Sequence, residues 1–133
     1  MNRYLKEYKW SNIFTMIRNL RSNSAICLDN FSHQMVVITG ATSGIGFVTA
    51  EKYASHGADL LFINRNEKKS DELCESLRKK FNSNCDYILA DFSRLSETHS
   101  AAKRLANLDK KIDVLIHIAG VYITKKTFTQ DNL

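Results

Sequence analysis

MVVITGATSGIG, residues 35–46, is the stretch that decides the fold of this chain. It opens with a run of mainly apolar and β-branched residues, 35–39, which is typical of a strand that is buried on both faces. Three glycines follow, Gly40, Gly44 and Gly46, and a helical pattern begins at once. Glycine permits φ > 0 and the close approach of a ligand, and the first turn of a helix presents free N–H groups to an anion. The stretch therefore predicts a strand–loop–helix unit that holds a phosphate, with a tight turn that binds nothing as the alternative.

Length and charge set bounds around this unit. The chain has 133 residues and a net charge of +5, which fits one domain or part of one. Residues 1–34 hold five Lys and Arg residues against two acidic residues, whereas the remaining chain is nearly balanced, with fourteen against twelve. Because a protein that reads nucleic acid carries a clustered basic face on its body, we expect no nucleic-acid partner.

The three cysteines, Cys27, Cys74 and Cys85, form no Cys-x-x-Cys pair. Their odd number and their spacing predict free thiols in a reducing compartment and no metal site. No apolar run approaches the roughly 18 residues of a transmembrane helix, so we expect no membrane-spanning segment.

Residues 1–21 have the pattern of a basic amphipathic helix, and residues 22–34 that of a polar connector. Three interpretations of the helix stay open. It packs on the surface of its own domain, it makes peripheral contact with a membrane, or it is an organelle-targeting peptide. The expected location is therefore intracellular, in the cytoplasm or on a membrane surface, with organelle targeting open.

From Met35 onward, apolar runs of strand length alternate with helical patterns. The expected strands are 35–39, 60–63, 85–90 and 114–118, and the expected helices are 44–56, 67–81 and 94–107. Such alternation predicts a parallel sheet with right-handed crossovers. In a doubly wound sheet the strand order is 3-2-1-4, and the ligand crevice lies at the carboxyl ends of strands 1 and 4. The glycine loop is at this place.

Helix boundaries and inner faces follow from capping residues and periodicity. Asn64 or Asn66 is expected to cap the second helix and Ser93 the third, and Gly57 is expected to end the first. The expected inward residues are Ile45, Val48 and Tyr53 in helix 44–56, Leu73, Leu77 and Phe81 in helix 67–81, and Leu95, His99, Ala102 and Leu105 in helix 94–107.

These residues together resemble the short-chain dehydrogenase/reductase family. Its cofactor motif, TGxxxGIG, is matched in full by Thr39–Gly46, and further markers stand at the ends of the next three strands as Asn64-Arg65, Asp91-Phe92 and Ala119-Gly120. The resemblance covers about residues 35–133. It implies a Rossmann-like domain over these residues, preceded by the segment 1–34, and an oxidoreductase that transfers hydride between a nicotinamide dinucleotide and a carbonyl or alcohol substrate.

The resemblance also implies which residues bind the cofactor. The glycines would shape the turn around the pyrophosphate with contacts from its neighbours, Asp91 and Phe92 would lie by the adenine, and Ala119 and Gly120 would border the adenosine ribose. The full set is Gly40, Thr42, Ser43, Gly44, Ile45, Gly46, Arg65, Asp91, Phe92, Ala119 and Gly120. Two alternatives stay open: Asp91 starts the cap region at Ser93, and Phe92 is a core residue.

Arg65 discriminates between NAD and NADP. An NAD site uses a carboxylate near the end of strand 2, whereas an NADP site uses a cation for the 2′-phosphate. Asn64 stands at the carboxylate position, and Arg65 follows with a guanidinium that can bind phosphate through two hydrogen bonds. Lys68 and Lys69 raise the local positive potential. We therefore predict NADP rather than NAD, with a solvated Arg65 as the alternative.

The chain departs from the family in two ways. His117-Ile118 stand where the family usually has Asn-Asn, which removes two side-chain amides; we expect His117 to be a core residue rather than a catalytic one. The family's Ser and Tyr-x-x-x-Lys, which supply acid–base chemistry, have one literal counterpart, Tyr122 to Lys126. This match directly follows the turn at Gly120, and residue 109, thirteen positions earlier, is Asp, so we interpret it as coincidence.

We therefore predict that these 133 residues hold no catalytic residue and are inactive alone. The apolar strand 114–118 would otherwise be an uncovered sheet edge, which favours a cofactor-binding portion of a longer enzyme. The expected partners are a nicotinamide dinucleotide, a small carbonyl or alcohol substrate and, for the complete enzyme, a second copy of itself. The alternative is a non-catalytic dinucleotide-binding module, associated with a membrane through residues 1–21.

Overall fold

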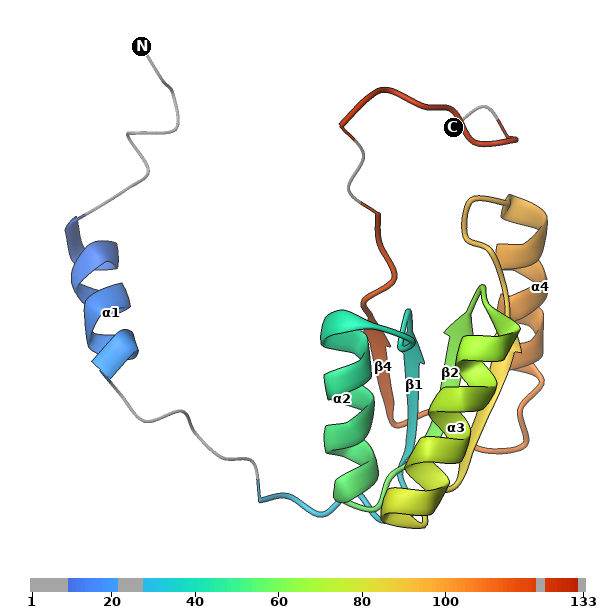
Figure 1. The fold of residues 1–133 in the computed structure, drawn as a ribbon, viewed down its shortest axis with the longest axis horizontal. Helices are drawn as coiled ribbons and strands as arrows, with labels where there is room; N and C mark the ends of the chain where they lie inside the picture. Colours follow the sequence, from blue (N-terminus) through green and yellow to red (C-terminus); the bar gives the residue numbers. More distant parts are fainter. Residues whose placement is uncertain (1–9, 22–27, 122–123, 132–133) are drawn as a thin grey trace.

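The structure, a computed structural model, describes residues 10–21, 28–121 and 124–131. In this part of the chain four strands form one sheet with helices on both faces, and a further helix precedes it (Figure 1). The elements are α1 (Trp10–Arg21), β1 (Met35–Thr39), α2 (Gly44–Ser55), β2 (Asp59–Asn64), α3 (Glu67–Phe81), β3 (Cys85–Leu89), α4 (Leu95–Ala106) and β4 (Val114–His117).

The sheet confirms the predicted topology. All three strand pairs are parallel, and the order is β3-β2-β1-β4. β1 lies between β2 and β4, with Thr39 beside Ile63 on one side and beside His117 on the other. The strand order therefore reverses at β1, and the carboxyl ends of all four strands lie at the same edge.

Alternating side chains of the strands build two cores. On one face Val36, Ile38 and Phe62 pack with residues of α2 and α3, and on the other Val37, Leu61 and Ile63 pack with α4. Both sides of β1 and β2 are thus buried, as the continuous apolar runs predict. Figure 1 shows α2 and α3 over one face and α4 over the other.

The inner face of α2 differs from the prediction. Ile45 and Val48 are 76% and 64% exposed, and the buried residues are Gly46, Ala50 and Ala54. Small residues at every fourth position let this helix lie close to the sheet directly after the glycine loop. This requirement outweighs the burial of the larger side chains that stand one or two positions away. Tyr53 is partly buried in the core, as predicted.

The inner face of α4 is also rotated relative to the prediction. Leu95, His99 and Ala102 are exposed, Ala101 is buried and Leu105 packs on the core. The predicted and observed faces share Leu105, so periodicity alone did not separate them. The predicted Ser93 cap is wrong as well: the N-cap position is Arg94, and its side chain makes no capping hydrogen bond.

The ends of α2 and α3 follow local chemistry. Asn66 Oδ1 accepts from Lys69 N at 2.9 Å and caps α3, as one of the two predicted alternatives. Asn82 ends that helix in the left-handed region at φ 53°, and Gly57, at φ 84°, follows the end of α2. The predicted core residues Leu73 and Leu77 of α3 are buried, and Phe81 packs against them.

Cys74 and Cys85 are free thiols buried in the core between α3 and β3. Their mutual hydrogen bond, together with burial, raises the pKa of the Cys74 thiol. Cys27 lies outside the described residues. Because the two thiols fill volume in the hydrophobic core, we interpret them as packing residues.

Helix α1 begins at Trp10; residues 1–9 of the predicted helix and 22–27 of the predicted connector lie outside the described residues. Among its described side chains, Phe14, Met16 and Leu20 are 68%, 58% and 78% exposed and are not buried against the domain. In Figure 1 the helix stands apart from the sheet. No helix in the described ranges is long and apolar enough to cross a bilayer.

Leu77→Ala tests the core on the α2–α3 face. Leu77 is fully buried, so the substitution should lower the free energy of unfolding in urea by about 2–5 kcal/mol. Leu28→Ala is the matched control, because Leu28 is 85% exposed and its loss should cost less than about 0.5 kcal/mol. Equal effects of the two substitutions would contradict this packing.

Candidate dinucleotide-binding site

The predicted site residues come together at the carboxyl edge of the sheet. The glycine loop follows β1, Arg65 follows β2, and Asp91 follows β3 by two residues. Ala119 and Gly120 follow β4 by two and three residues. Because the strands are parallel, these four connections share one edge, and the loop after β1 lies where the strand order reverses.

Two close approaches give the glycine loop its shape. Gly40 has φ 72°, and a Cβ there would lie 2.7 Å from Ala119 Cα. A Cβ on Gly46 would lie 2.2 Å from the Gly40 carbonyl oxygen. Both positions therefore exclude any side chain, since real Cβ contacts are longer. The loop is closed against the end of β4, and α2 starts directly beneath it.

Gly44, the first residue of α2, differs from Gly40 and Gly46 because it has free space around it. A Cβ built there would meet no atom within 4 Å, so the loop surface is open at the start of the helix. Ser43 and Ile45 beside it are exposed, Ile45 to 76%. Thr42 is partly buried in the same turn. An anion could thus approach the first-turn N–H groups of α2.

Thr39 ties β1 to the residues after β4. Its Oγ1, 1% exposed as a residue, accepts from Ile118 N and Ala119 N, each at 3.1 Å. His117-Ile118 replace the two amide side chains that the family usually has after strand 4. The junction between β1 and the residues after β4 is therefore held by the Thr39 hydroxyl and backbone N–H groups. His117 itself is exposed, so the expectation of a core histidine is wrong, because odd-numbered positions of β4 face away from the covered core.

Asn64 ties the loop to β2. Its Oδ1 accepts from Ala41 N at 2.9 Å, and its Nδ2 donates to Ser70 Oγ at 3.1 Å. The Ser70 hydroxyl in turn donates to the Asn66 carbonyl at 2.8 Å. Asn64 is 3% exposed, so its amide braces the loop rather than facing a ligand. The sequence suggested Asn64 as a possible cap of α3 and as an uncharged residue at the carboxylate position, and neither expectation included this role.

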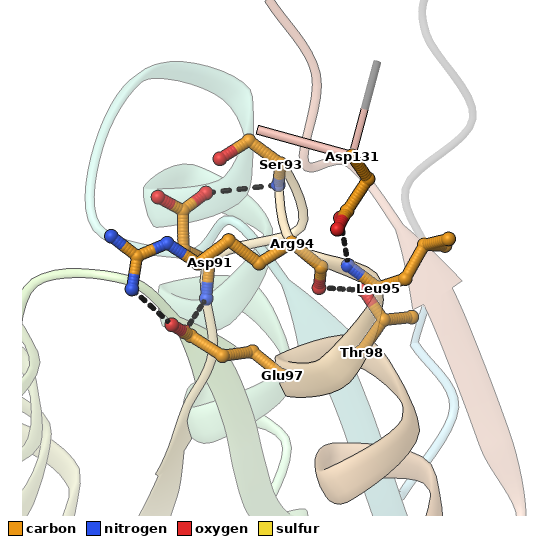
Figure 2. Close-up of polar contacts among 7 residues, drawn as sticks. All are labelled: Asp91, Ser93, Arg94, Leu95, Glu97, Thr98 and Asp131. Atoms are coloured by element: carbon orange, nitrogen blue, oxygen red, sulfur yellow. Dashed lines mark hydrogen bonds and ion pairs between the residues drawn. The ribbon is translucent and has the colours of Figure 1, made fainter. Parts of the chain in front are cut away.

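Asp91 and its neighbours form a compact polar cluster at the start of α4 (Figure 2). Asp91 Oδ1 accepts from Ser93 N at 2.9 Å, and Asp91 N donates to Glu97 Oε2 at 2.7 Å. The hydrogen bonds from Ser93, first its backbone N–H, lower the pKa of the Asp91 carboxyl, and the positive charges of Arg65 and Arg94 add to this effect. Asp91 therefore holds the turn before α4, although the residue at the N-cap position is Arg94 and not the predicted Ser93.

Arg65 and Phe92 are both presented to solvent at this edge. Arg65 is exposed, and its charge acts on the Asp91 carboxyl from the neighbouring strand end. Lys68 and Lys69, in the first turn of α3, are exposed as well. Phe92 is 42% exposed, which argues against the alternative of a core residue. The edge therefore offers an exposed cation after β2 and an exposed aromatic ring after β3.

The remaining sequence-based expectations concern catalysis and metal binding. The literal Tyr-x-x-x-Lys match starts at Tyr122, outside the described residues; Lys126 is exposed, and its Nζ lies 4.7 Å from the centroid of the Phe128 ring. Within the described ranges, no three His, Cys, Asp or Glu side chains are grouped so as to hold a metal ion.

A doubly wound parallel sheet with a glycine loop at its switch point defines the class of Rossmann-like dinucleotide-binding domains. Comparison with known proteins narrows this class. The family model described as "short chain dehydrogenase" matches residues 34–132. The chain therefore belongs to the short-chain dehydrogenase family.

Similar proteins include hydroxysteroid dehydrogenase-like protein 1 of Gallus gallus, 33% identical over 88 residues, which are 66% of this chain and 26% of that protein. The human protein named inactive hydroxysteroid dehydrogenase-like protein 1 is 36% identical over 95 residues, 71% of this chain and 28% of its own length. This chain thus spans about a quarter of the length of these relatives.

Among solved structures, a short-chain dehydrogenase from Sphingobium yanoikuyae in complex with NADPH matches with a TM-score of 0.65 and 32% identity. The match covers 74% of this chain and 39% of that one. L-sorbose reductase from Gluconobacter frateurii, complexed with NADPH and L-sorbose, has a TM-score of 0.65 and 26% identity, covering 73% and 37%.

Asn64→Ala tests the brace between β2 and the loop. It leaves the N–H of the fully buried Ala41 without its acceptor, and an unsatisfied buried donor costs about 1–3 kcal/mol. We expect this loss in urea unfolding, with faster amide exchange at Ala41. Asn84→Ala is the control, because Asn84 is exposed. Unchanged exchange at Ala41 in Asn64→Ala would show that the brace has no such role.

Proposed function

We propose that this chain supplies the dinucleotide-binding part of an NADP-dependent oxidoreductase, which transfers hydride between the nicotinamide and a carbonyl or alcohol substrate. The observation that carries the proposal is the Thr39–Gly46 loop. It is closed against Ala119, opens at Gly44 and leads directly into α2. The place of this loop at the switch point of the sheet, with free space at Gly44 beside the first-turn N–H groups of α2, favours a phosphate over a turn that binds nothing.

The residues present fit a dinucleotide. Gly40, Gly44 and Gly46, with Thr42, Ser43 and Ile45 between them, would hold the pyrophosphate through the loop and the first turn of α2. Asp91 and Phe92 would contact the adenine, and Ala119 and Gly120 would border the adenosine ribose. The nicotinamide, when bound, supplies or accepts the hydride. The contribution of this chain is to bind and orient the cofactor.

Arg65 supports NADP over NAD. The side chain that would carry the carboxylate of an NAD site is Asn64, which is turned inward as a brace. The next residue presents an exposed guanidinium, flanked by the exposed Lys68 and Lys69. A guanidinium can bind a 2′-phosphate through two parallel hydrogen bonds. Two of the similar solved structures are described as complexes with NADPH, which is consistent with this choice.

Arg65→Ala tests the choice of cofactor. Loss of a charge-assisted contact to the 2′-phosphate should weaken NADPH binding roughly ten- to a hundredfold and leave NADH binding nearly unchanged. Titration calorimetry with both cofactors measures the difference. Arg104→Ala is the matched control, because Arg104 is an exposed cation in the last turn of α4.

The same titration can overturn the proposal. Tight NADH binding with no preference for NADPH, unaffected by Arg65→Ala, would assign the site to NAD. Absence of binding to either cofactor would reject the dinucleotide site itself.

A non-catalytic dinucleotide-binding module is the second candidate. Three similar proteins are named inactive hydroxysteroid dehydrogenase-like protein 1. In addition, His117-Ile118 at the carboxyl end of β4 depart from the Asn-Asn that the family usually has there. Both candidates bind NADPH, so binding does not separate them. NADPH oxidation by the full-length protein with a panel of carbonyl compounds does: turnover supports the enzyme, and binding without turnover supports the module. Formation of a homo-oligomer by the complete enzyme stays a prediction.

Peripheral membrane contact is proposed for α1. Phe14, Ile17 and Leu20 follow one another at helical spacing and are 68%, 41% and 78% exposed. Residues 8–28 contain no Asp or Glu and three basic residues. An apolar stripe on a segment with only positive charge suits the interface of an anionic bilayer. We therefore propose an intracellular protein that contacts a membrane surface through this helix.

Leu20→Asp tests this contact. The full chain should sediment with phosphatidylserine-containing vesicles and much less with pure phosphatidylcholine. The substitution removes the burial of one Leu, worth about 1.5–3 kcal/mol, so partitioning should fall at least tenfold. Thr15→Asp adds the same charge on the opposite side of the helix and should retain more binding. Equal sedimentation of wild type and Leu20→Asp would reject the contact.

A further inference from the structure

The segment after β4 returns to the start of α4. In Figure 1 residues 124–131 pass from the β4 side of the sheet toward the α4 side, beyond the carboxyl edge. Asp131 Oδ2 accepts from Leu95 N at 2.7 Å, a contact between residues 36 positions apart. Figure 2 shows the Asp131 carboxylate directed at the first residue of α4. The segment is therefore tied to the helix that follows β3.

Helix α4 has no cap from its own N-cap residue. The first four N–H groups of a helix have no partner inside it, and a Ser, Thr, Asp or Asn usually supplies one. Here the N-cap is Arg94, whose side chain makes no such bond. A carboxylate at this end also suits the positive end of the helix dipole. Asp131 thus provides from a distant segment what the local sequence lacks.

The capped turn holds the loop that contains Asp91. Glu97, in the first turn of α4, accepts from Asp91 N at 2.7 Å through Oε2 and from Arg94 Nη1 at 3.0 Å through Oε1. Arg94 N also donates to the Asp91 carbonyl at 3.0 Å. The position of this loop therefore depends on where the first turn of α4 lies, and this turn is fixed in part by Asp131.

We propose that Asp131 is a positioning residue for the adenine end of the dinucleotide site: it caps α4 from outside and thereby fixes Asp91 and Phe92. The proposal rests on the proposed function, in which these two residues contact the adenine. In this proposal Asp131 does not contact the cofactor. Its action passes through Leu95, Glu97 and the backbone of Asp91.

The first measurement tests the cap without any ligand. Amide hydrogen exchange at Leu95 should rise about fivefold in Asp131→Ala, the usual effect of losing a cap. Asp131→Asn keeps an acceptor oxygen and should return most of the protection. Asp109→Ala removes an exposed carboxylate from the connection between α4 and β4 and should change nothing. Unchanged exchange at Leu95 in Asp131→Ala would overturn the cap.

The second measurement tests the link to the site with a fragment that carries only the adenine end. Titration with adenosine 2′,5′-bisphosphate should show about fivefold weaker binding to Asp131→Ala and recovery in Asp131→Asn, with the Asp109→Ala control unaffected. Faster exchange at Leu95 with unaltered affinity would overturn the positioning role. If the wild-type chain binds neither this fragment nor NADPH, the proposed function fails, and the exchange data still report separately on the cap.

Discussion

The absence of a side chain at Gly46 is the constraint on which the rest of the structure depends. A methyl group there would lie 2.2 Å from the Gly40 carbonyl oxygen, so α2 can follow β1 through this short loop only with glycine at that place. Gly40 meets the same condition against Ala119. The two contacts join β1, α2 and the end of β4, and they set the edge at which the other three connections arrive. Ala50 and Ala54 continue the close contact along α2, which is why larger neighbours are left outside.

Two buried polar residues convert this steric arrangement into a stable one. Thr39 and Asn64, 1% and 3% exposed, each bind backbone N–H groups of a neighbouring connection. Buried N–H groups need such partners, because leaving them without one is costly. The ends of β1, β2 and β4 are therefore held together by side chains that no ligand needs to touch. The residues that face outward, Arg65 and Phe92 among them, remain available for binding.

The sequence predicted the topology and the set of edge residues, because these depend on strong local signals: apolar runs, glycine spacing and the polar residues that end each strand. It predicted less well where a choice depends on docking. Ile45 and Val48 were placed inward because size favours burial, yet the helix packs through its small residues. The predicted inner face of α4 was rotated relative to the observed one, because Leu105 belongs to both faces and does not distinguish between them. Asp131 carries no local signal at all, since its partner lies 36 residues away. Asn64 was expected either to cap α3 or to leave the carboxylate position uncharged, yet its amide hydrogen-bonds to Ala41 and Ser70 across two connections.

The pairing of β1 with β4 has a consequence for how the protein acquires its binding edge. Thr39 and Ala119 are 80 residues apart, and the whole of α2, β2, α3, β3 and α4 lies between them in the chain. Closing so long a segment is slow compared with forming contacts between neighbours in sequence, because the entropy of the intervening chain is lost before the contact stabilises anything. The glycine loop is therefore made early along the chain but completed only when the residues up to Ala119 are present. During synthesis, a nascent chain that has formed β1, β2 and their helices would still lack the residues that close Gly40 on its far side.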